Sequence, residues 1–332
     1  MNGLPEKHTA RPASVDDIDA IVDIVNQYGI QLTGEALYPP EYVRRFLTLP
    51  GFDLADSSKL VFSPRGSISG LGLVMDIQAP YVQVSGWGLV PEAEQGRGIG
   101  STLHTWIESR ARKAIAKAPE GTRVALMQTV FDQDGPAKAH LERLGYEQTR
   151  HFWRMAVDLD QALPSPSWPD GIAVQNVDLR KDLEHSLRAA NEAFRDHYGH
   201  VDGDFEQQLE RQQHNVENDP EYTSDLSFLA LDNEEIAGVC FCSPRSGTDT
   251  SAGYVNSLAV LRPWRKRGLG LALLLHAFHV LREMGKVRAA LHVDAESPTG
   301  ATRLYEKADM HVDQLSHEYQ LELRAGVDLA AE

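Results

Sequence analysis

Cysteine is scarce in this sequence: its 332 residues include two, Cys240 and Cys242. Alternation along a strand puts both side chains on one face, and a disulfide that closes across a single residue has poor geometry. We therefore expect two free thiols, which suit a reducing cytoplasm, in preference to a disulfide, a metal site or a redox pair.

Long apolar runs and an excess of basic residues are also missing. No stretch approaches the roughly 20 apolar residues of a membrane span, and the N-terminal MNGLPEKHTARPAS has no apolar signal-peptide core. Lys and Arg number 32 against 48 Asp and Glu, for a net charge of -16. We expect a cytoplasmic protein with no membrane or nucleic-acid partner, since phosphate-backbone binding normally requires a basic excess. A local basic patch in such an acidic chain then indicates a site for a small anion.

The chain does have the length for two domains of about 150 residues each. Residues 155–179, MAVDLDQALPSPSWPDGIAVQNVDL, place three prolines, serines and a glycine between two strand-like ends, which is typical of a linker. We predict an N-terminal domain over residues 1–160, a linker over 161–170 and a C-terminal domain over 171–332.

The two halves repeat one order of elements. Each begins with a short strand and an amphipathic helix, continues with two strands joined by a turn, and reaches a third strand before a glycine-containing turn and a long helix. A strand, a helix and a closing alternating segment follow. The order β-α-β-β-β-turn-α-β-α-β, found twice, predicts an α/β fold of the α+β type, duplicated along the chain.

The glycine-containing turns carry the strongest functional signal. They read QGRGIG at residues 95–100 and RKRGLG at residues 265–270, with Arg262 just before the second. A helix N-terminus offers unpaired N–H groups and the positive end of its dipole to an anion, and glycine lets the main chain approach closely. Neither turn has Walker or G-x-G-x-x-G spacing. A charged, purely structural helix cap is the alternative, and finding the same context twice argues against it.

Between a strand and a helix, [QR]-x-x-G-x-[GA] resembles the acyl-coenzyme A pyrophosphate motif of the GCN5-related N-acetyltransferases, the GNAT family. Both halves match it. The second half is also similar to that family downstream, where LHVDAESPTGATRLYEKADM matches its strand, its N-x-x-A-type helix and its L-Y-E-x-x-G-[FM] segment. The resemblance covers residues 60–158 and 226–323. It implies two tandem GNAT-like domains, each a mixed, mostly antiparallel twisted sheet flanked by helices, and the pairing of a preserved with a degraded half is similar to mycothiol synthases.

The resemblance implies a coenzyme site in the second half, with acetyl-CoA as co-substrate. Main-chain amides would bind the pyrophosphate at Arg267, Gly268, Leu269 and Gly270. Positive charge for the phosphates would come from Arg262, Arg265 and Lys266. The pantetheine arm would pair with the strand edge at Leu258, Ala259 and Val260. Ser297 replaces the family's Asn but can still hydrogen-bond the cofactor, and Asp309 replaces its Gly in a turn that Asp is expected to distort.

Tyr305 holds the position at which the family often has a tyrosine that protonates the departing thiolate. A phenol with a pKa of about 10 suits that role, and the alternative is an aromatic of the helix–sheet interface. In the first half Leu141 aligns with Tyr305, and a leucine cannot donate a proton. We therefore predict a catalytic C-terminal domain and an N-terminal domain that is a structural or cofactor-holding relic.

The general base and the acceptor site are less defined. His292 and Asp294 share a face of one strand, with Glu296 nearby, and each could relay a proton through water or be structural. Residues 191–207, NEAFRDHYGHVDGDFEQ, border the acceptor site in the family and are rich in His, Asp, Tyr and Arg. The spacing of their His and Asp is irregular and acetyl transfer needs no metal, so we expect none.

These observations predict an enzyme that moves an acetyl group from acetyl-CoA to a primary amine of a small molecule or peptide by direct attack. Two alternatives remain open: the same chemistry on the cysteinyl amine of a mycothiol precursor, and a non-catalytic acyl-CoA-binding or partner-binding protein. The sequence leaves the acceptor and the oligomeric state undefined.

Overall fold

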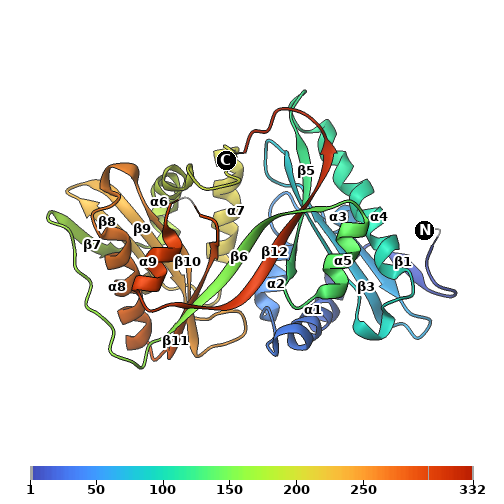
Figure 1. Ribbon diagram of the computed structural model, residues 1–332, viewed down its shortest axis with the longest axis horizontal. Helices are drawn as coiled ribbons and strands as arrows, with labels where there is room; N and C mark the ends of the chain where they lie inside the picture. Colours follow the sequence, from blue (N-terminus) through green and yellow to red (C-terminus); the bar gives the residue numbers. More distant parts are fainter. Residues whose placement is uncertain (1–2, 298, 331–332) are drawn as a thin grey trace. The chain divides into compact units, whose positions relative to one another are not determined.

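The structure is a computed structural model that describes residues 3–297 and 299–330, and these form two compact units (Figure 1). Unit 1 comprises the chain up to residue 149, with 203–208 and 317–329. Unit 2 comprises 150–202, 209–316 and 330. The units therefore differ from the predicted domains, because 150–170 fall in unit 2 while 203–208 and 317–329 fall in unit 1.

Unit 1 is a mixed sheet with helices, in the strand order β1-β2-β3-β4-β5-β12. The pair β4–β5 is parallel, and β1–β2, β2–β3 and β3–β4 are antiparallel. The elements, in chain order, are β1 (Thr9–Arg11), α1 (Ile18–Thr33), α2 (Pro40–Leu47), α3 (Leu54–Ser57), β2 (Ser58–Phe62), β3 (Ile68–Met75), β4 (Gln83–Leu89), α4 (Ile99–Ala111), β5 (Val124–Phe131), α5 (Gly135–Arg143) and β6 (Glu147–Asp158).

Unit 2 repeats the arrangement, in the strand order β6-β11-β10-β9-β8-β7. The pair β10–β11 is parallel, and β6–β11, β7–β8, β8–β9 and β9–β10 are antiparallel. Its elements are β7 (Ile172–Asn176), α6 (Leu179–Phe194), α7 (Phe205–Glu217), β8 (Ser227–Asp232), β9 (Glu235–Ser243), β10 (Ala252–Val260), α8 (Leu269–Glu283), β11 (Arg288–Asp294), α9 (Ala301–Lys307) and β12 (His311–Arg324). The predicted fold class is confirmed.

The element order departs from the prediction by extra helices before the second strand of each half. In the first half these are α2 and α3, and in the second half α7. Pro39 and Pro40 are adjacent, a pattern that is typical of a turn. In the structure Pro40 occupies the first helical position and starts α2. No residue of α7 is fully buried, and its apolar stripe is sparse, with Phe205, Leu209 and Val216 on one side of a mostly polar helix.

The closing strands also differ from the prediction that each half ends on its own strand. Most of β6, from Arg150 on, lies in unit 2 and pairs with β11. The end of β12, from His317 on, lies in unit 1 beside β5, where Arg324 donates from Nε to the Thr122 carbonyl at 2.8 Å. Because duplication gives both sheets an equivalent edge, at β5 and at β11, a closing strand from either half can satisfy the hydrogen bonds of the other sheet.

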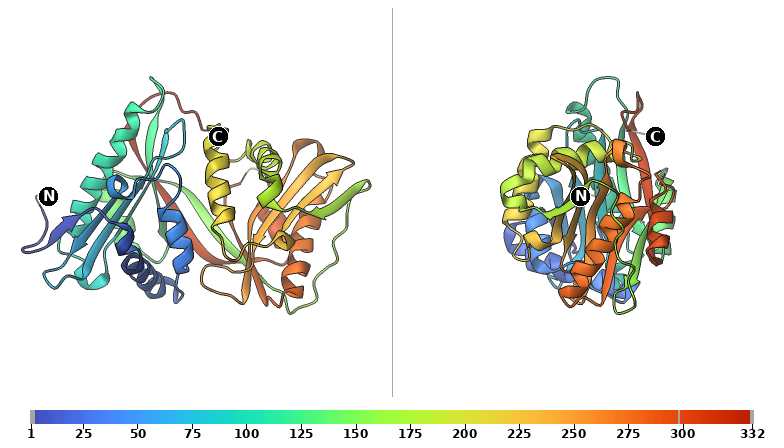
Figure 2. Two further views of the ribbon diagram at one scale, coloured as in Figure 1. Left: turned by 180° about the vertical axis from the view of Figure 1, so that it is seen from behind. Right: turned by 90° about the vertical axis from the view of Figure 1, so that its left-hand side faces the viewer.

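Each sheet carries helices on both faces, because successive strand residues point to opposite sides. In unit 1, Leu60 packs with α1 and α2, whereas Val61 packs with α4. In unit 2, Leu229 packs with α6, whereas Phe228 packs with α8. Figures 1 and 2 show these layers from several sides. Buried apolar contacts thus fix α4 and α8, the helices that follow the glycine turns. Within the described residues, no helix combines the length and apolar character needed to cross a lipid bilayer.

Candidate functional site

The second glycine turn joins β10 to α8. A short 3-10 turn follows the strand, and the chain then takes left-handed conformations at Lys266 (φ +62°) and Gly268 (φ +86°). Such angles cost glycine little and other residues more, which explains a glycine at the start of the helix. A Cβ at Gly268 would meet no heavy atom within 4 Å. The turn therefore faces open space.

The N–H groups at the start of α8 are available. In the part of the chain that the structure describes, the first main-chain hydrogen bond of the helix runs from the Ala272 N–H to the Gly268 carbonyl, at 3.1 Å. No main-chain carbonyl accepts from Gly268, Leu269 or Gly270 there. Together with the positive end of the helix dipole, these groups form a cradle for an anion.

Two of the arginines predicted to bind phosphate are held by Asp196, just after α6. Arg262 donates from Nε to Asp196 Oδ2 at 2.9 Å and from Nη2 to Oδ1, and Arg265 donates from Nη1 to Oδ2 at 2.5 Å. Arg265 also donates to the carbonyls of Val260 and Ala193, each at 2.9 Å. The guanidinium groups of Arg262 and then Arg265 hold the pKa of Asp196 well below its usual range.

Uncompensated positive charge at this turn comes from Lys266 and Arg267. Both side chains are exposed, and among the described residues neither forms an ion pair. Asp196, in contrast, offsets much of the charge on Arg262 and Arg265. The cations best placed to attract an incoming phosphate are therefore Lys266 and Arg267.

Strands β10 and β11 separate as they approach the turn. They pair over Ala252–Tyr254 and Arg288–Ala290, and no pairing is present beyond these residues. A bulge between Val255 and Ser257 bends β10 against β9. The segment Leu258–Val260 pairs with β9 along one edge, while its other edge has no partner strand among the described residues. That free edge suits the addition of an extended, amide-containing chain such as pantetheine.

Tyr305 lies on α9 with its ring in the core of unit 2. It is 8% exposed and shares an apolar cluster with Cys240 of β9. Burial, and then the adjacent Cys240 thiol, raises the pKa of Tyr305 to about 12. The phenol therefore stays protonated at neutral pH and can donate its proton. Cys240 and Cys242 are free thiols with Sγ atoms 3.8 Å apart, which confirms the prediction that they share one face of a strand.

The turn after α9 keeps its left-handed residue despite the loss of glycine. Asp309 has φ +59°, and Gly145 has φ +86° at the corresponding point after α5. The expectation that Asp309 distorts this turn is wrong, because the aspartate adopts the conformation at a cost in backbone strain. The match also supports the alignment of Leu141, which is fully buried, with Tyr305.

The turn between β11 and α9 carries Ser297 and two of the candidate bases. The Ser297 hydroxyl lies 2.8 Å from that of Thr299, and Asp294 accepts from the Glu296 N–H at 2.9 Å. Glu296 also pairs with Arg150 at 2.7 Å. These contacts favour structural roles for Asp294 and Glu296, and a cofactor contact of Ser297 stays a prediction.

His197 and His292 are among the histidines of unit 2 whose pKa lies below the ordinary value. Burial, and then the charge of Arg154, lowers the pKa of His292 to about 4, and its Nδ1 lies 2.6 Å from the Tyr254 hydroxyl. Burial, and then the charge of Arg265, lowers the pKa of His197. The His197 ring meets that of Phe194 edge-on, with centroids 4.6 Å apart. Both imidazoles are therefore neutral at pH 7, and each is a weaker proton acceptor than an ordinary histidine, His292 by the wider margin.

The segment predicted to border the acceptor is divided between the units. Residues 191–202 lie in unit 2, and 203–207 lie in unit 1. In unit 2 the Arg150 guanidinium stacks on the Tyr198 ring at 3.6 Å, and His200 lies 3.2 Å from Asp202. These contacts pack part of the segment on unit 2, and most of its residues are half-buried.

The first glycine turn repeats the backbone of the second. Gly98 is left-handed (φ +83°) and precedes α4. Gln95 donates from Nε2 to the Val90 carbonyl at 3.3 Å, as Arg265 does from Nε to the Val260 carbonyl. The predicted repetition of strand, turn and helix is confirmed down to a side-chain contact.

The surroundings of the first turn are different, because the N-terminal segment lies near it, although Gly98 itself is exposed. The Gly3 carbonyl oxygen would lie 3.7 Å from a Cβ at Gly98, and Leu4 packs on the apolar cluster at the start of α4. The basic side chain of this turn, Arg97, pairs with Glu94 at 3.3 Å. The space next to the glycine, which is open at Gly268, is partly filled at Gly98, and the positive charge of Arg97 is paired with Glu94.

The interior below the first turn is polar. The His104 Nε2 lies 3.2 Å from Gln128 Oε1, and Gln128 Nε2 donates to the Tyr146 hydroxyl at 2.9 Å. At the positions of His104 and Tyr146, unit 2 has Leu274 and Met310, both buried. The space beneath the turn has thus been filled differently in the two units.

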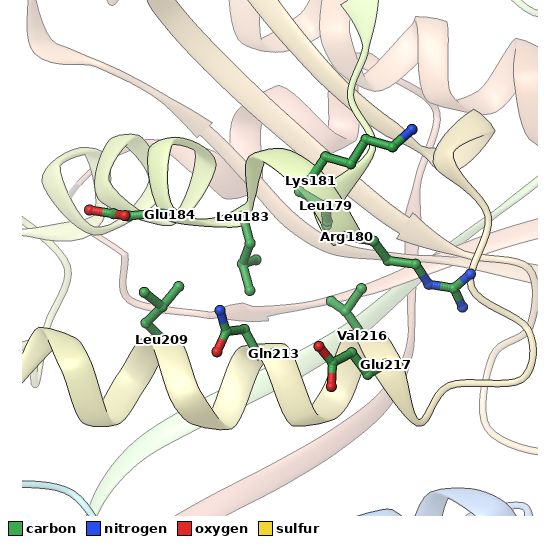
Figure 3. Close-up of a pocket in the computed structure, with 9 residues that line it drawn as sticks. All are labelled: Leu179, Arg180, Lys181, Leu183, Glu184, Leu209, Gln213, Val216 and Glu217. Carbon is green, nitrogen blue, oxygen red and sulfur yellow. The ribbon is translucent and has the colours of Figure 1, made fainter.

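A hollow of about 190 Å³ lies between α6 and α7 (Figure 3). Leu183, Leu209 and Val216 point into it, with charged side chains around the rim. At 1.5 Å per helical residue, Leu183 lies about 15 Å along α6 from Ala193, which contacts Arg265. The hollow is therefore separate from the glycine turn.

Asp196 and Cys240 are the neighbours of the site that sequence reasoning missed. Asp196 lies within the segment predicted to border the acceptor. Its negative charge indicated that it could form an ion pair, but the sequence did not show that the partners are arginines of the glycine turn. For Cys240, the only signal in the sequence was its spacing from Cys242, and that spacing does not indicate that the Cys240 thiol lies next to Tyr305.

Comparisons with known proteins agree with this geometry. Residues 187–310 match the acetyltransferase (GNAT) family. The chain is 30% identical over 226 residues to a mycothiol acetyltransferase of Thermobispora bispora, a match that covers 67% of this chain and 70% of that protein.

Two solved structures are similar over nearly the whole chain. A GCN5-related N-acetyltransferase from Sphaerobacter thermophilus is 32% identical with a TM-score of 0.78, covering 98% of this chain and 99% of that one. A tandem GNAT protein from the clavulanic acid biosynthesis pathway shares the fold at 16% identity and a TM-score of 0.68, covering 96% of this chain and 100% of that one.

Proposed function

The chain belongs to the GNAT family of N-acetyltransferases, and from that premise we propose that unit 2 transfers an acetyl group from acetyl-CoA to a primary amine. The observation that carries the proposal is the second glycine turn, where an open, cationic helix start lies next to an unpaired strand edge. Unit 1 has the same backbone with the N-terminal segment near the turn and the turn's charge neutralised.

The residues present fit a coenzyme A molecule. The N–H groups of Gly268, Leu269 and Gly270 bind the pyrophosphate, and Gly268 leaves room for it. Lys266 and Arg267 supply the charge that attracts the phosphates. The free edge of Leu258–Val260 pairs with the amides of the pantetheine arm.

Acetyl-CoA supplies an activated acetyl thioester, so the reaction forms a carbon–nitrogen bond and breaks a carbon–sulfur bond. Tyr305 donates its proton to the departing sulfur, and its high pKa keeps that proton in place until the sulfur becomes basic. The amine loses a proton to a base. The His197 imidazole is the candidate, whereas a pKa lowered to about 4 makes His292 a poor proton acceptor at pH 7.

A narrower acceptor is supported by the similarity to mycothiol acetyltransferases. By that similarity, the candidate amine is that of the cysteinyl group in a mycothiol precursor. The fold and the glycine turn are compatible with other amines, so this acceptor is the second, more specific proposal.

A screen of acceptors tests both proposals. Acetyl-CoA would be offered with amino acids, polyamines, aminoglycosides, peptides and the desacetyl mycothiol precursor, and acetylated products would be measured by mass spectrometry. We expect turnover on at least one primary amine, and the highest kcat/KM on the cysteinyl amine under the narrower proposal. Coenzyme A binding without turnover on any of these amines would contradict the proposed activity.

A further inference from the structure

One carboxylate holds two arginines of the coenzyme turn. Both Asp196 oxygens are occupied, Oδ1 by Arg262 and Oδ2 by Arg262 and Arg265. Asp196 lies just after α6, 66 residues before Arg262 and 69 before Arg265. The contact therefore ties the segment after α6 to the turn that follows β10.

The tied segment also packs against the open strand of unit 2. Phe194 belongs to the apolar cluster that includes Ala259 of the open strand, and His197 packs edge-on against the Phe194 ring. Residues 195–202 then continue the segment that sequence reasoning associated with the acceptor. A change at Asp196 would therefore loosen the segment that carries His197.

The two arginines are not equivalent partners. Arg265 is 29% exposed and also donates to two main-chain carbonyls, so it is fixed in the turn. Arg262 is 58% exposed, and Asp196 accounts for its hydrogen bonds among the described residues. Arg262 is therefore the arginine that can exchange one anion for another.

Unit 1 has a counterpart of this contact with the charges rearranged. At the position of Arg262 the first turn has Glu92, and Gln31 near the end of α1 donates to Glu92 Oε2. The helix-to-turn contact is thus present in both units, but the turn of unit 1 carries the negative partner.

We propose that Asp196 is a positioning residue that latches residues 195–202 onto the coenzyme turn and competes with coenzyme A phosphates for Arg262. The proposal rests on the proposed function of unit 2. Asp196 sets a limit on coenzyme affinity, because its negative charge lies beside the phosphate cradle. In return it fixes the segment that carries His197, so coenzyme binding and acceptor positioning share one arginine.

Two substitutions separate the two roles. Asp196→Asn removes the charge and should bind coenzyme A at least about threefold more tightly, since the repulsion is lost and Arg262 is released. Arg262→Gln should bind it at least about threefold more weakly. Asp196→Asn should show faster hydrogen–deuterium exchange over residues 190–202, because it breaks the latch, whereas Arg262→Gln should show a smaller increase because Arg265 still pairs with Asp196. A purely structural defect would not raise coenzyme affinity.

Glu221→Gln is the matched control. Glu221 is 33% exposed, as Asp196 is, and pairs with Arg245. Calorimetry with coenzyme A and exchange over 190–202 should both equal the wild type.

The outcomes decide the proposal as follows. An unchanged or weaker affinity in Asp196→Asn, or wild-type exchange over 190–202 in that variant, overturns it. Should Asp196→Asn fail to fold, a coenzyme A affinity equal to wild type in Arg262→Gln overturns it instead. If neither wild type nor variants bind coenzyme A, the proposed function of unit 2 is wrong, and the exchange measurements still decide whether Asp196 holds the segment.

Discussion

The two glycine turns have the same backbone and opposite surroundings. Gly98 and Gly268 differ by 3° in φ, and each begins a helix that is fixed to its sheet by apolar side chains. The first lies near the N-terminal segment and has Glu92 and a paired Arg97 around it. The second is open and cationic. Packing of the helix preserves the turn geometry, whereas the ability to bind an anion depends on side chains that can be exchanged without loss of the fold.

The largest expected difference between the turns is in how much turnover and coenzyme A binding are lost when the central glycine of each turn is substituted. Gly268→Glu puts a carboxylate where the pyrophosphate should bind, and should abolish turnover and weaken coenzyme A binding at least tenfold, about 1.4 kcal/mol. Gly98→Glu imposes the same left-handed strain and should leave turnover near the wild type. Calorimetry and steady-state kinetics on both variants, with folding checked by circular dichroism, make the comparison. Loss of activity in a folded Gly98→Glu would reverse the assignment of the active unit.

A second comparison uses two buried tyrosines. Tyr305→Phe should lower kcat by about 10²–10⁴-fold and leave coenzyme A affinity unchanged, because only the proton donor is lost. Tyr146→Phe in unit 1 removes a hydroxyl bonded to Gln128 and should leave kcat unchanged. Because the pKa of Tyr305 is raised to about 12, the wild-type rate should not fall through loss of this proton until well above about pH 10, the ordinary tyrosine pKa. A kcat within about threefold of wild type in Tyr305→Phe would leave Tyr305 a core aromatic.

The cations of the turns give a smaller contrast. Lys266→Gln and Arg267→Gln should each weaken coenzyme A binding by about threefold to tenfold at low salt, and less at high salt because the interaction is screened. Arg97→Gln should have no effect, since Arg97 is paired with Glu94. Calorimetry at two ionic strengths measures all three, and a salt-independent loss in the unit 2 variants would mean that they act through folding.

The smallest effect should appear at the turns after α5 and α9. Asp309→Gly should raise the free energy of unfolding by about 1 kcal/mol, and Gly145→Asp should lower it by about as much, because both positions are left-handed. Urea unfolding of the two variants tests this reciprocal exchange. Equal and opposite shifts are expected, and a destabilised Asp309→Gly would show that the aspartate side chain contributes a contact of its own.

Sequence reasoning reached the features that depend on local pattern. Alternation, apolar periodicity and glycine at helix starts predicted the strands, the long helices and both turns, because each acts over a few residues. It missed α7, whose side chains bury little, and the contacts of Asp196, whose arginines lie 66 and 69 residues away. It also assigned β6 and β12 to their own halves. An alternating pattern predicts that a segment is a strand, but it does not show which of two equivalent sheet edges the strand will pair with.

The exchange of closing strands has a consequence for synthesis of the protein. The sheet of unit 1 is translated first, yet β12, which pairs with β5, is encoded at residues 311–324. Until that segment leaves the ribosome, β5 keeps an unpaired edge, and such an edge is a template for pairing with other chains. Strand pairs so distant in sequence also form slowly. A nascent chain therefore carries an unfinished N-terminal sheet from the synthesis of β5 until β12 is made, and its dependence on chaperones should be greatest in that interval.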